Sequence, residues 1–230
     1  MELLKSGKTK DVYDNGDGTY TLAFKDDATG ANGVADPGAN QVGLSIKGKA
    51  KGGVRLSKYF FEQIEAAGIP THFISADVDT CTMVVRPAQM FGEGLEFVCR
   101  IYADGSYVRR YGKYVNKGDY LDYLMEVTLK DDDRDDPLAN EDSLYKLGLM
   151  VPGEYEIFGD LTEQVTKIIE AELAVRHMVL WDIKLEFGRD KDGNVLLIDD
   201  ISTDCWRVKD MDGNSIDPLE LVERFFGDAE

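Results

Sequence analysis

The sequence is poor in the residues that build disulfide frameworks and transition-metal sites. Its 230 residues include only three cysteines and two histidines. Cys81, Cys99 and Cys205 are widely spaced, without a CxxC pair or a cysteine–histidine metal spacing. No apolar run approaches the ~20 residues of a membrane span, and the opening segment MELLKSGKTK lacks the apolar core of a signal peptide. These absences predict a cytoplasmic protein with reduced thiols.

The sequence also lacks an excess of positive charge. Its formal net charge is −18, which argues against binding to nucleic acid polymers or anionic membranes, because both require a basic surface. A small anionic ligand stays compatible with this charge, since it needs only a local group of lysines and arginines. The chain is long enough for one large domain or two small ones, and its hydrophobic content of 43% is ordinary for a globular protein.

The most informative stretch runs from Trp181 to Arg207. Charged and apolar residues alternate in it, Asp182, Lys184 and Glu186 with Ile183, Leu185 and Phe187. In a β-strand this alternation places the charges on one face. The turn sequence 189–194 and a second apolar strand, 195–198, follow, and that strand ends in Asp199-Asp200. A solvated charged face is the simpler interpretation, but clustered carboxylates beside so apolar a strand favour a Mg²⁺ site.

Helix and strand patterns are mixed along the rest of the chain. Short strands are expected over residues 3–25, helices over 54–67, from Asp160 onward and over 218–226, and a strand over 95–103 that ends at the turn 104–106. The glycine-rich segment 26–53 is expected to be a loop, either solvated or a lid over anionic substrates. Without regular β–α–β alternation, the pattern predicts an α+β fold.

Two basic groups have the chemistry of phosphate binding. Lys8 and Lys10 alternate on the first strands, although exposed lysines of an edge strand are equally typical. Arg100 and Ser106 flank a strand-to-turn junction, where a guanidinium group and backbone N–H groups suit a phosphate. His72 and His177 are interpreted as structural, because neither has a second metal ligand nearby in the sequence.

Five ordered motifs carry a family resemblance. They are Gly7–Tyr13 (G-K-x-K-x-V-Y), Ala67–Thr71 (AGIPT), Glu96–Arg110 (E-x-V-x-R with G-S and R-R), Lys130–Pro137 (K-D-D-x-x-x-D-P) and Leu180–Arg207 (D-x-K-x-E-F-G, an acidic strand end and D-C-W-R). Together they resemble SAICAR synthetase, an enzyme of purine biosynthesis. The resemblance departs from the family pattern at Cys205, where a serine is usual, around Gly53-Val54, and in a shortened C-terminal segment.

The resemblance implies a fold and a reaction. The fold would be a small N-terminal β-rich domain (residues 1–88) and a larger C-terminal α+β domain (residues 89–230), with ATP in a cleft between them. The reaction would join L-aspartate to carboxyaminoimidazole ribonucleotide, with ATP and Mg²⁺ as cofactors. The implied partners are therefore small molecules, with neither nucleic acid nor membrane, and a homo-oligomer is left open.

The resemblance also implies residue roles. Lys184, Asp182 and Asp204 would be catalytic, and Glu186 and Asp199 would bind the metal, with Asp200 as the alternative if the strand register slips by one residue. Lys8, Lys10, Met90 and Lys130 would bind ATP, and Glu96, Arg100, Ser106, Asp136 and Arg207 would bind the substrate.

Two other functions stay open on the sequence. One is an ATP-dependent ligase or phosphotransferase that acts on a different acid or amine, and the other is a non-catalytic nucleotide-binding protein. Cys205 is expected to be tolerated in place of serine and to react with a bulky thiol reagent unless the imidazole nucleotide is bound. The alternative for Cys205 is a packed, inert thiol.

Overall fold

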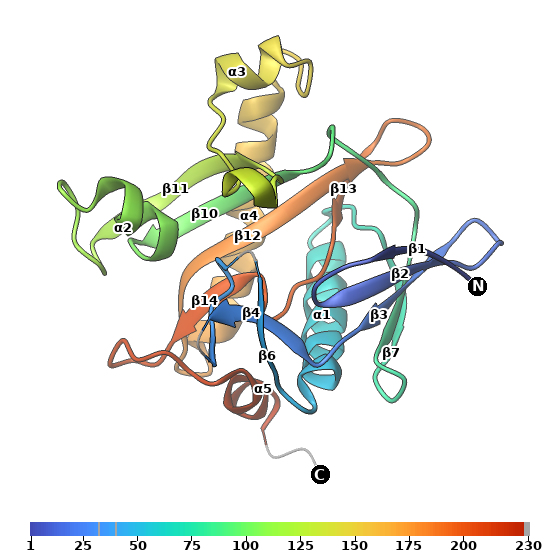
Figure 1. Cartoon of the computed structure of the whole chain (residues 1–230), viewed down its shortest axis with the longest axis horizontal. Coiled ribbons are helices and arrows are strands. Elements are labelled where there is room, and N and C mark those ends of the chain that lie inside the picture. Colours follow the sequence, from blue (N-terminus) through green and yellow to red (C-terminus); the bar gives the residue numbers. More distant parts are fainter. Residues whose placement is uncertain (32, 40, 228–230) are drawn as a thin grey trace. The chain divides into compact units, whose positions relative to one another are not determined.

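The computed structural model describes residues 1–31, 33–39 and 41–227. The chain forms two compact units (Figure 1). The first contains Met1–Gln89, Gly188–Cys205 and the segment from Ile216 onward, and the second contains Met90–Phe187 and Trp206–Ser215. The sequence predicts one continuous second domain from residue 89, whereas the chain returns to the first unit within its longest strand and again at its end. None of the described helices is long and apolar enough to cross a membrane.

A five-stranded antiparallel sheet forms most of the first unit. Its order is β1 (Glu2–Ser6), β2 (Lys10–Asp14), β3 (Tyr20–Phe24), β8 (Thr82–Val85) and β7 (Phe73–Asp77). The β2–β3 turn closes as its sequence predicts, because Gly16 and Gly18 take positive φ and the Asp14 carboxylate accepts a 2.7 Å hydrogen bond from the Gly16 N–H. The short strands expected over residues 3–25 are therefore confirmed.

The glycine-rich segment differs from the loop that its composition predicts. It forms a three-stranded antiparallel sheet of β5 (Val34–Ala35), β4 (Asp27–Ala31) and β6 (Val42–Ser45). Helix α1 (Lys49–Ala66) then begins five residues before the predicted start at Val54, and so includes Gly52 and Gly53. A Cβ on Gly52 would lie 2.7 Å from the Val222 side chain. The two glycines therefore serve close packing inside a helix rather than loop flexibility.

Helix α1 supplies the core of the first unit. Val54, Leu56, Phe60, Phe61 and Ile64 are fully buried, and α1 packs against β3, β7 and β8. Helix α5 (Pro218–Phe226) packs on α1 through aromatic contacts such as Tyr59–Phe225, with 5.1 Å between ring centroids. The strand β13 (Val195–Ile198) also belongs to this unit and has the bounds that the sequence predicts.

The second unit is built on β10 (Leu95–Tyr102), which pairs with β11 (Tyr120–Leu129) on one side and β12 (Val179–Arg189) on the other. Strand β14 (Trp206–Lys209) pairs with β12. Helix α4 (Glu154–Ala174) runs along one face of β10 and β11 (Figure 1). There Phe158 contacts Phe97 and Phe187, with ring centroids 5.1 and 5.4 Å apart. One face of this sheet is therefore aromatic core.

Four short elements accompany these strands, and one of them differs from expectation. They are β9 (Gln89–Met90), α2 (Gly105–Tyr111), a 3₁₀ turn (Asp132–Arg134) and α3 (Glu141–Lys146). The sequence predicts a plain turn at residues 104–106, whereas helix α2 forms there. Asp104 caps this helix by accepting a hydrogen bond from the Gly105 N–H. The longer helix α4 begins at Glu154, six residues before the predicted start at Asp160.

Candidate functional site: two clusters of buried charge

The face of the second sheet opposite α4 carries a line of charged residues, which we call the charged sheet face. Strand register places Glu96 opposite Glu186, Val98 opposite Lys184 and Arg100 opposite Asp182. The neighbouring strands add Glu126 and Thr128 from β11 and Arg207 from β14. Asp182 and Glu186 are only 3% and 4% exposed. The predicted alternation is confirmed, and the solvated-face interpretation is wrong for these two carboxylates.

Arg100 lies at the centre of the charged sheet face and is 3% exposed. Its Nε donates to Glu126 at 2.7 Å, its Nη1 to Asp182 at 3.0 Å and its Nη2 to the Ser106 hydroxyl at 3.0 Å. Arg110 also contacts Glu126, at 2.5 Å. A guanidinium group held by two carboxylates and a hydroxyl is fixed in orientation. Arg100 therefore organises this face, and Glu126 is a member of the site that the family motifs do not mark.

Asp182 joins Arg100 to a second arginine. Its Oδ2 accepts from Arg100 and from Arg207 Nη1, the latter at 2.9 Å. The Arg207 side chain is 16% exposed, more than the 3% of Arg100. Asp182 thus holds two guanidinium groups together, and of the two, Arg207 is the more accessible to an anion.

Two buried carboxylates face each other across β10 and β12, and each has its own lysine. Glu96 accepts from Lys184 at 2.7 Å and from the Thr128 hydroxyl at 2.8 Å, while Glu186 pairs with Lys130. Buried carboxylates in register would repel strongly without these ammonium groups. The arrangement brings together four of the predicted site residues: Glu96, Lys130, Lys184 and Glu186.

Asp136 lies in a loop after the 3₁₀ turn, and Met90 is the second residue of the two-residue strand β9. Asp136 has φ +44° and accepts a 2.8 Å hydrogen bond from the Asp131 N–H. Burial, together with the negative charge of Glu96, raises its pKa above the usual value. Met90 belongs to β9 and is 36% exposed.

The first unit has its own cluster of buried charge, at the end of β13. Lys10 lies 2.6 Å from Asp199 and also pairs with Asp200. Burial alone would lower the pKa of Lys10, but the two carboxylates outweigh it and raise the pKa above its ordinary value. Asp199 has φ +69°, and its carbonyl oxygen lies 2.9 Å from His72 Nε2. His72 is buried, so its structural interpretation agrees with this packing.

The two aspartates of this cluster differ in exposure. The Asp199 side chain is 27% exposed, whereas that of Asp200 is 5% exposed and accepts a hydrogen bond from the Ser202 hydroxyl. Of this pair, Asp199 is therefore the more accessible to a ligand. Lys8 lies between β1 and β2 and is partly buried.

A further ion pair, Lys49–Asp204, lies in the same unit. Lys49 is 5% exposed and also donates to the Asp27 carbonyl at 2.9 Å. Burial raises the pKa of Asp204, and the Lys49 ammonium opposes that shift only in part. Lys49 was not predicted individually. The sequence feature that could have identified Lys49 is the run of basic residues at 47–58, but only the start of α1 distinguishes Lys49 from its neighbours in that run.

Cys205 is buried beside these residues and donates from Sγ to the Ser202 carbonyl, 3.2 Å away. Burial and the charge of Asp200 raise the pKa of its thiol well above the ordinary value. This environment favours the packed, inert thiol over the reactive one.

The predicted metal ligands lie in different units, Glu186 in the second and Asp199 in the first. Among the residues that the structure describes, no three or more Asp, Glu, His or Cys side chains form a group that could hold a metal ion. Any Mg²⁺ would therefore need further oxygen ligands from water or a bound phosphate, which is how Mg²⁺ commonly binds to proteins.

The model of the SAICAR synthetase family matches residues 3–220. The chain is 50% identical to the phosphoribosylaminoimidazole-succinocarboxamide synthase of Clostridium tetani, over 96% of this chain and 97% of that protein. The chain belongs to the SAICAR synthetase family. A family member from Finegoldia magna is 34% identical, over 99% of this chain and 94% of that protein.

Solved structures of SAICAR synthetases share the fold. A SAICAR synthetase in complex with ADP matches with a TM-score of 0.85 and 30% identity, over 98% of each chain. The enzyme from Pyrococcus horikoshii matches with a TM-score of 0.81 and 30% identity, over 96% of this chain and 99% of that one. These matches confirm the α+β, SAICAR synthetase-like fold class.

Proposed function

We propose that this protein joins L-aspartate to the carboxylate of carboxyaminoimidazole ribonucleotide, with hydrolysis of ATP to ADP and phosphate. The observation that carries the proposal is the charged sheet face, on which each predicted strand residue has an ion-pair partner: Glu96 with Lys184, Glu186 with Lys130, and Asp182 with both Arg100 and Arg207. Its support is the family membership over nearly the whole chain, together with the ADP complex of a protein with the same fold.

The reaction needs activation of a carboxylate, because its negative charge repels a nucleophile. Transfer of the ATP γ-phosphoryl group to a carboxylate oxygen forms an acyl phosphate and releases ADP. The amine of aspartate then attacks the acyl carbon, an amide bond forms, a proton leaves the nitrogen, and inorganic phosphate departs with the former carboxylate oxygen. Positioning and neutralisation of charge are the main tasks of the protein in such a transfer.

Arg100 and Arg207, which Asp182 holds together and which we call the arginine pair, suit the anionic substrate. Arg207 is the accessible guanidinium group, and Ser106 and Arg100 are bonded to each other beside it. We assign the phosphate of the imidazole nucleotide to Arg207 and Ser106. The resemblance implies that Arg100 binds the substrate and that Asp182 is catalytic, but both are 3% exposed, so we propose that they fix the positions of Arg207 and Ser106. Glu96 and Asp136 would complete the substrate contacts. Bidentate pairing makes arginine well suited to phosphate.

The lysines suit the nucleotide triphosphate. Lys8, Lys10 and Lys130 would offset the phosphate charges of ATP, and Met90 would contact its base. Lys184 and Asp204 would act near the reacting groups, where Glu96 and Lys49 respectively hold them. Each role follows the family motif that contains the residue.

Mg²⁺ fits the donor types of the two proposed ligands. Glu186 and Asp199 supply carboxylate oxygens, which hard cations prefer, and each already contacts an ammonium group that a cation could replace as the balancing charge. When bound, Mg²⁺ would neutralise the charge on the transferred phosphoryl oxygens.

A coupled ADP-release assay tests the proposal. The purified chain is given ATP, Mg²⁺ and carboxyaminoimidazole ribonucleotide with a panel of amino acids. We expect ADP release only when aspartate and the imidazole nucleotide are both present, with product mass confirming the new amide. Equal ATP turnover without either substrate would reject the ligase, preference for another amino acid would redefine its amine, and binding without turnover would support the non-catalytic alternative.

A further inference from the structure

Lys209, at the end of β14, is a lysine that the proposed chemistry does not use. It is only 3% exposed, and its Nζ lies 4.0 Å from the centre of the Trp181 ring and 3.3 Å from Asp104 Oδ2. A buried ammonium group is costly unless it is paired. Here the face of the indole ring and the carboxylate offset that cost, so Lys209 is buried in a specific cation–π contact and ion pair rather than being a surface lysine.

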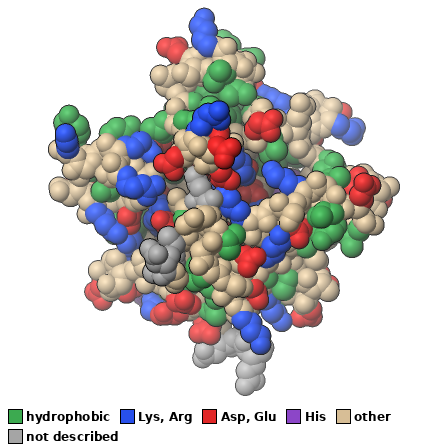
Figure 2. All heavy atoms as spheres, in the orientation of Figure 1, with side chains coloured by type: hydrophobic (Ala, Val, Ile, Leu, Met, Phe, Trp, Pro, Cys, Tyr) green, Lys and Arg blue, Asp and Glu red, His purple; other side chains and the backbone are tan. Residues whose placement is uncertain are grey.

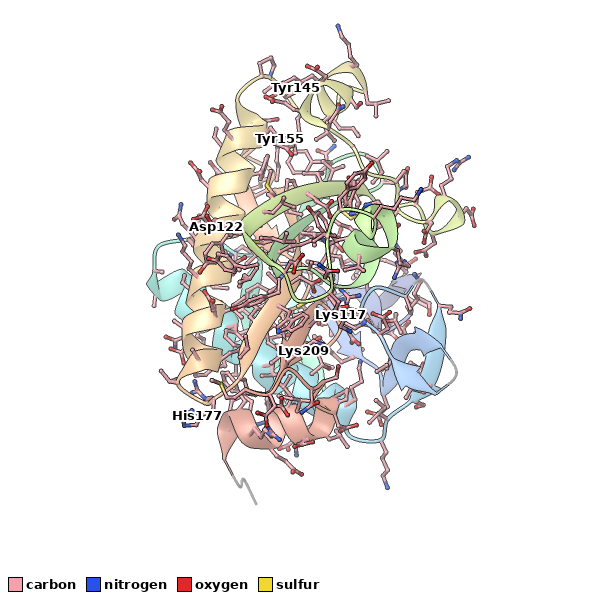
Figure 3. The ribbon with its side chains drawn as sticks, turned by 90° about the vertical axis from the view of Figure 1, so that its left-hand side faces the viewer. Lys117, Asp122, Tyr145, Tyr155, His177 and Lys209 are labelled. Carbon is pink, nitrogen blue, oxygen red and sulfur yellow. The ribbon has the colours of Figure 1, made fainter. Side chains whose placement is uncertain are left out.

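Asp104 uses its other carboxylate oxygen to fix the backbone of the next residue. Its Oδ1 accepts a 2.8 Å hydrogen bond from the Gly105 N–H, and Lys117 Nζ lies 3.2 Å from the same oxygen. Figure 3 shows Lys117 and Lys209, which come from different segments of the second unit and share this one carboxylate. Burial alone would raise the pKa of Asp104, but the Gly105 N–H and the two ammonium groups hold that pKa below its usual value.

Asp104 caps α2, and the first turn of that helix (residues 104–106, called the turn below) lies against the arginine pair. Gly105 has φ +54°, and a Cβ added to it would lie 2.6 Å from the guanidinium carbon of Arg207. The next residue, Ser106, accepts the 3.0 Å hydrogen bond from Arg100. The backbone of this turn is therefore in direct contact with one guanidinium group and bonded to the other, so its position decides where both can point.

Strand β14 carries both ends of this arrangement. Arg207 and Lys209 are two residues apart, so they share one face of the strand. Arg207 is the proposed anion ligand, and Lys209 anchors the carboxylate whose turn presses on Arg207. Movement of the turn without movement of β14 would open the contact at Gly105.

We propose that Asp104 and Lys209 are positioning residues, which hold the turn 104–106 against Arg207 and so shape the site for the anionic group of the imidazole nucleotide. This inference rests on the proposed function, because it names two further residues that determine nucleotide binding. Neither residue touches the substrate. Both act through Gly105, Ser106 and Arg207.

The test compares Lys209→Met, which keeps an unbranched stem over Trp181, with Asp104→Asn. Binding of carboxyaminoimidazole ribonucleotide alone is measured by titration calorimetry, and steady-state kinetics give the KM for each substrate. We expect each variant to weaken nucleotide binding roughly tenfold, the effect of losing one charge-assisted bond, while the KM for ATP changes by less than about twofold. Lys209→Arg, which keeps the cation, should recover part of the affinity.

Two controls make the result specific. Lys117→Met removes the more exposed of the two lysines that pair with Asp104; the Lys117 side chain is 60% exposed. This variant should weaken nucleotide binding much less, because exposed ion pairs contribute little. Lys113→Met, an exposed lysine of the same connection, should leave binding unchanged. If Lys209→Met does not fold, Gly105→Ala tests the same contact, because its Cβ would displace Arg207.

The outcomes separate this inference from the proposed function. Wild-type nucleotide affinity in Lys209→Met and Asp104→Asn would overturn the positioning role while the ligase stands. An equal rise in KM for ATP and nucleotide would indicate general loosening of the unit and also overturn it. Failure of the wild-type protein to bind the imidazole nucleotide would instead reject the proposed function.

Discussion

The two units of this protein hold buried charge in different ways. In the second unit the charges lie on regular strands, where Glu96 and Arg100 of β10 face Glu186 and Asp182 of β12. In the first unit they lie where elements begin or end: Lys10 starts β2 and Asp199 follows β13. Strand register fixes the spacing of the first kind, whereas the second kind depends on irregular backbone such as the positive φ of Asp199. On the surface, by contrast, the two signs of charge are not separated: acidic and basic side chains are interspersed over the face that Figure 2 shows, in spite of the net charge of −18.

The largest loss of stability should come from substitution of Arg100, at the centre of the charged sheet face. Arg100→Met leaves Glu126 and Asp182 buried with fewer partners, and removing one member of a buried ion pair costs about 3–5 kcal/mol of unfolding free energy. Urea denaturation measures this loss. Arg110→Met is the matched control, because the Arg110 side chain is 28% exposed and contacts only Glu126 of this pair. Equal losses in the two variants would mean that the charged sheet face has no central residue.

In the cluster of Lys10, Asp199 and Asp200 at the end of β13, substitution of Asp199 should change activity more than stability. Asp199→Asn should lower Mg²⁺-dependent turnover roughly 100-fold, because a metal ligand stabilises the transferred charge by several kcal/mol. Mn²⁺ binding, followed by electron paramagnetic resonance, provides a readout that does not depend on turnover. Asn tolerates the left-handed conformation of residue 199, so the backbone should persist.

Asp200→Asn is the matched control for that prediction. Asp200 is buried, bonded to Ser202 and paired with Lys10, so its substitution removes one member of a buried ion pair and should cost about 3 kcal/mol of stability, but it should change metal binding little. An active Asp199→Asn beside an inactive Asp200→Asn would show that the assignment is off by one residue.

The difference between the units also explains what sequence could predict. The alternation in Asp182–Phe187 predicts that strand and its charged face, because a period of two fixes the face of a strand residue, and the pattern around Arg100 predicts a second strand. The pairing of these two strands, which makes the charged face a shared one, is not predicted. No periodicity marks Lys49 or Glu126, whose partners are distant in sequence. The glycines at 52 and 53 predict a loop because glycine is usually flexible, whereas here Gly52 packs closely against the Val222 side chain and Gly53 against Phe24. Long-range packing decided each of these positions.

A smaller effect is expected at Asp136, whose pKa is raised by burial and by Glu96. A raised carboxyl pKa means that the folded state binds its proton more tightly than the unfolded state. The favourable contribution is thus present below the unfolded pKa of about 3.9 and is lost as pH rises through the folded value. Asp136→Asn, which keeps an acceptor for the Asp131 N–H, should therefore gain stability relative to wild type as pH rises above about 4. Urea denaturation at a series of pH values measures this. A difference between the two proteins that does not change with pH would contradict it. The same variant should bind the imidazole nucleotide more weakly.

The smallest effect concerns the rates at which the three thiols react, and it compares the two units directly. Cys99 lies buried on β10 and burial raises its pKa to about 11, whereas Cys205 lies buried in the irregular segment after β13. Neither thiol is ionised or exposed in the folded state, so modification must wait for local opening. Irregular segments open more readily than the centre of a sheet. We therefore expect partly exposed Cys81 to react first, Cys205 slowly and Cys99 last, as measured by mass spectrometry with a bulky thiol reagent under native conditions. Cys81→Ser removes the fast phase and leaves the two slow ones to be compared. Reaction of Cys99 before Cys205 would show that the strand-borne unit is the less stable of the two, and rapid reaction of Cys205 would restore the reactive thiol that the sequence suggested.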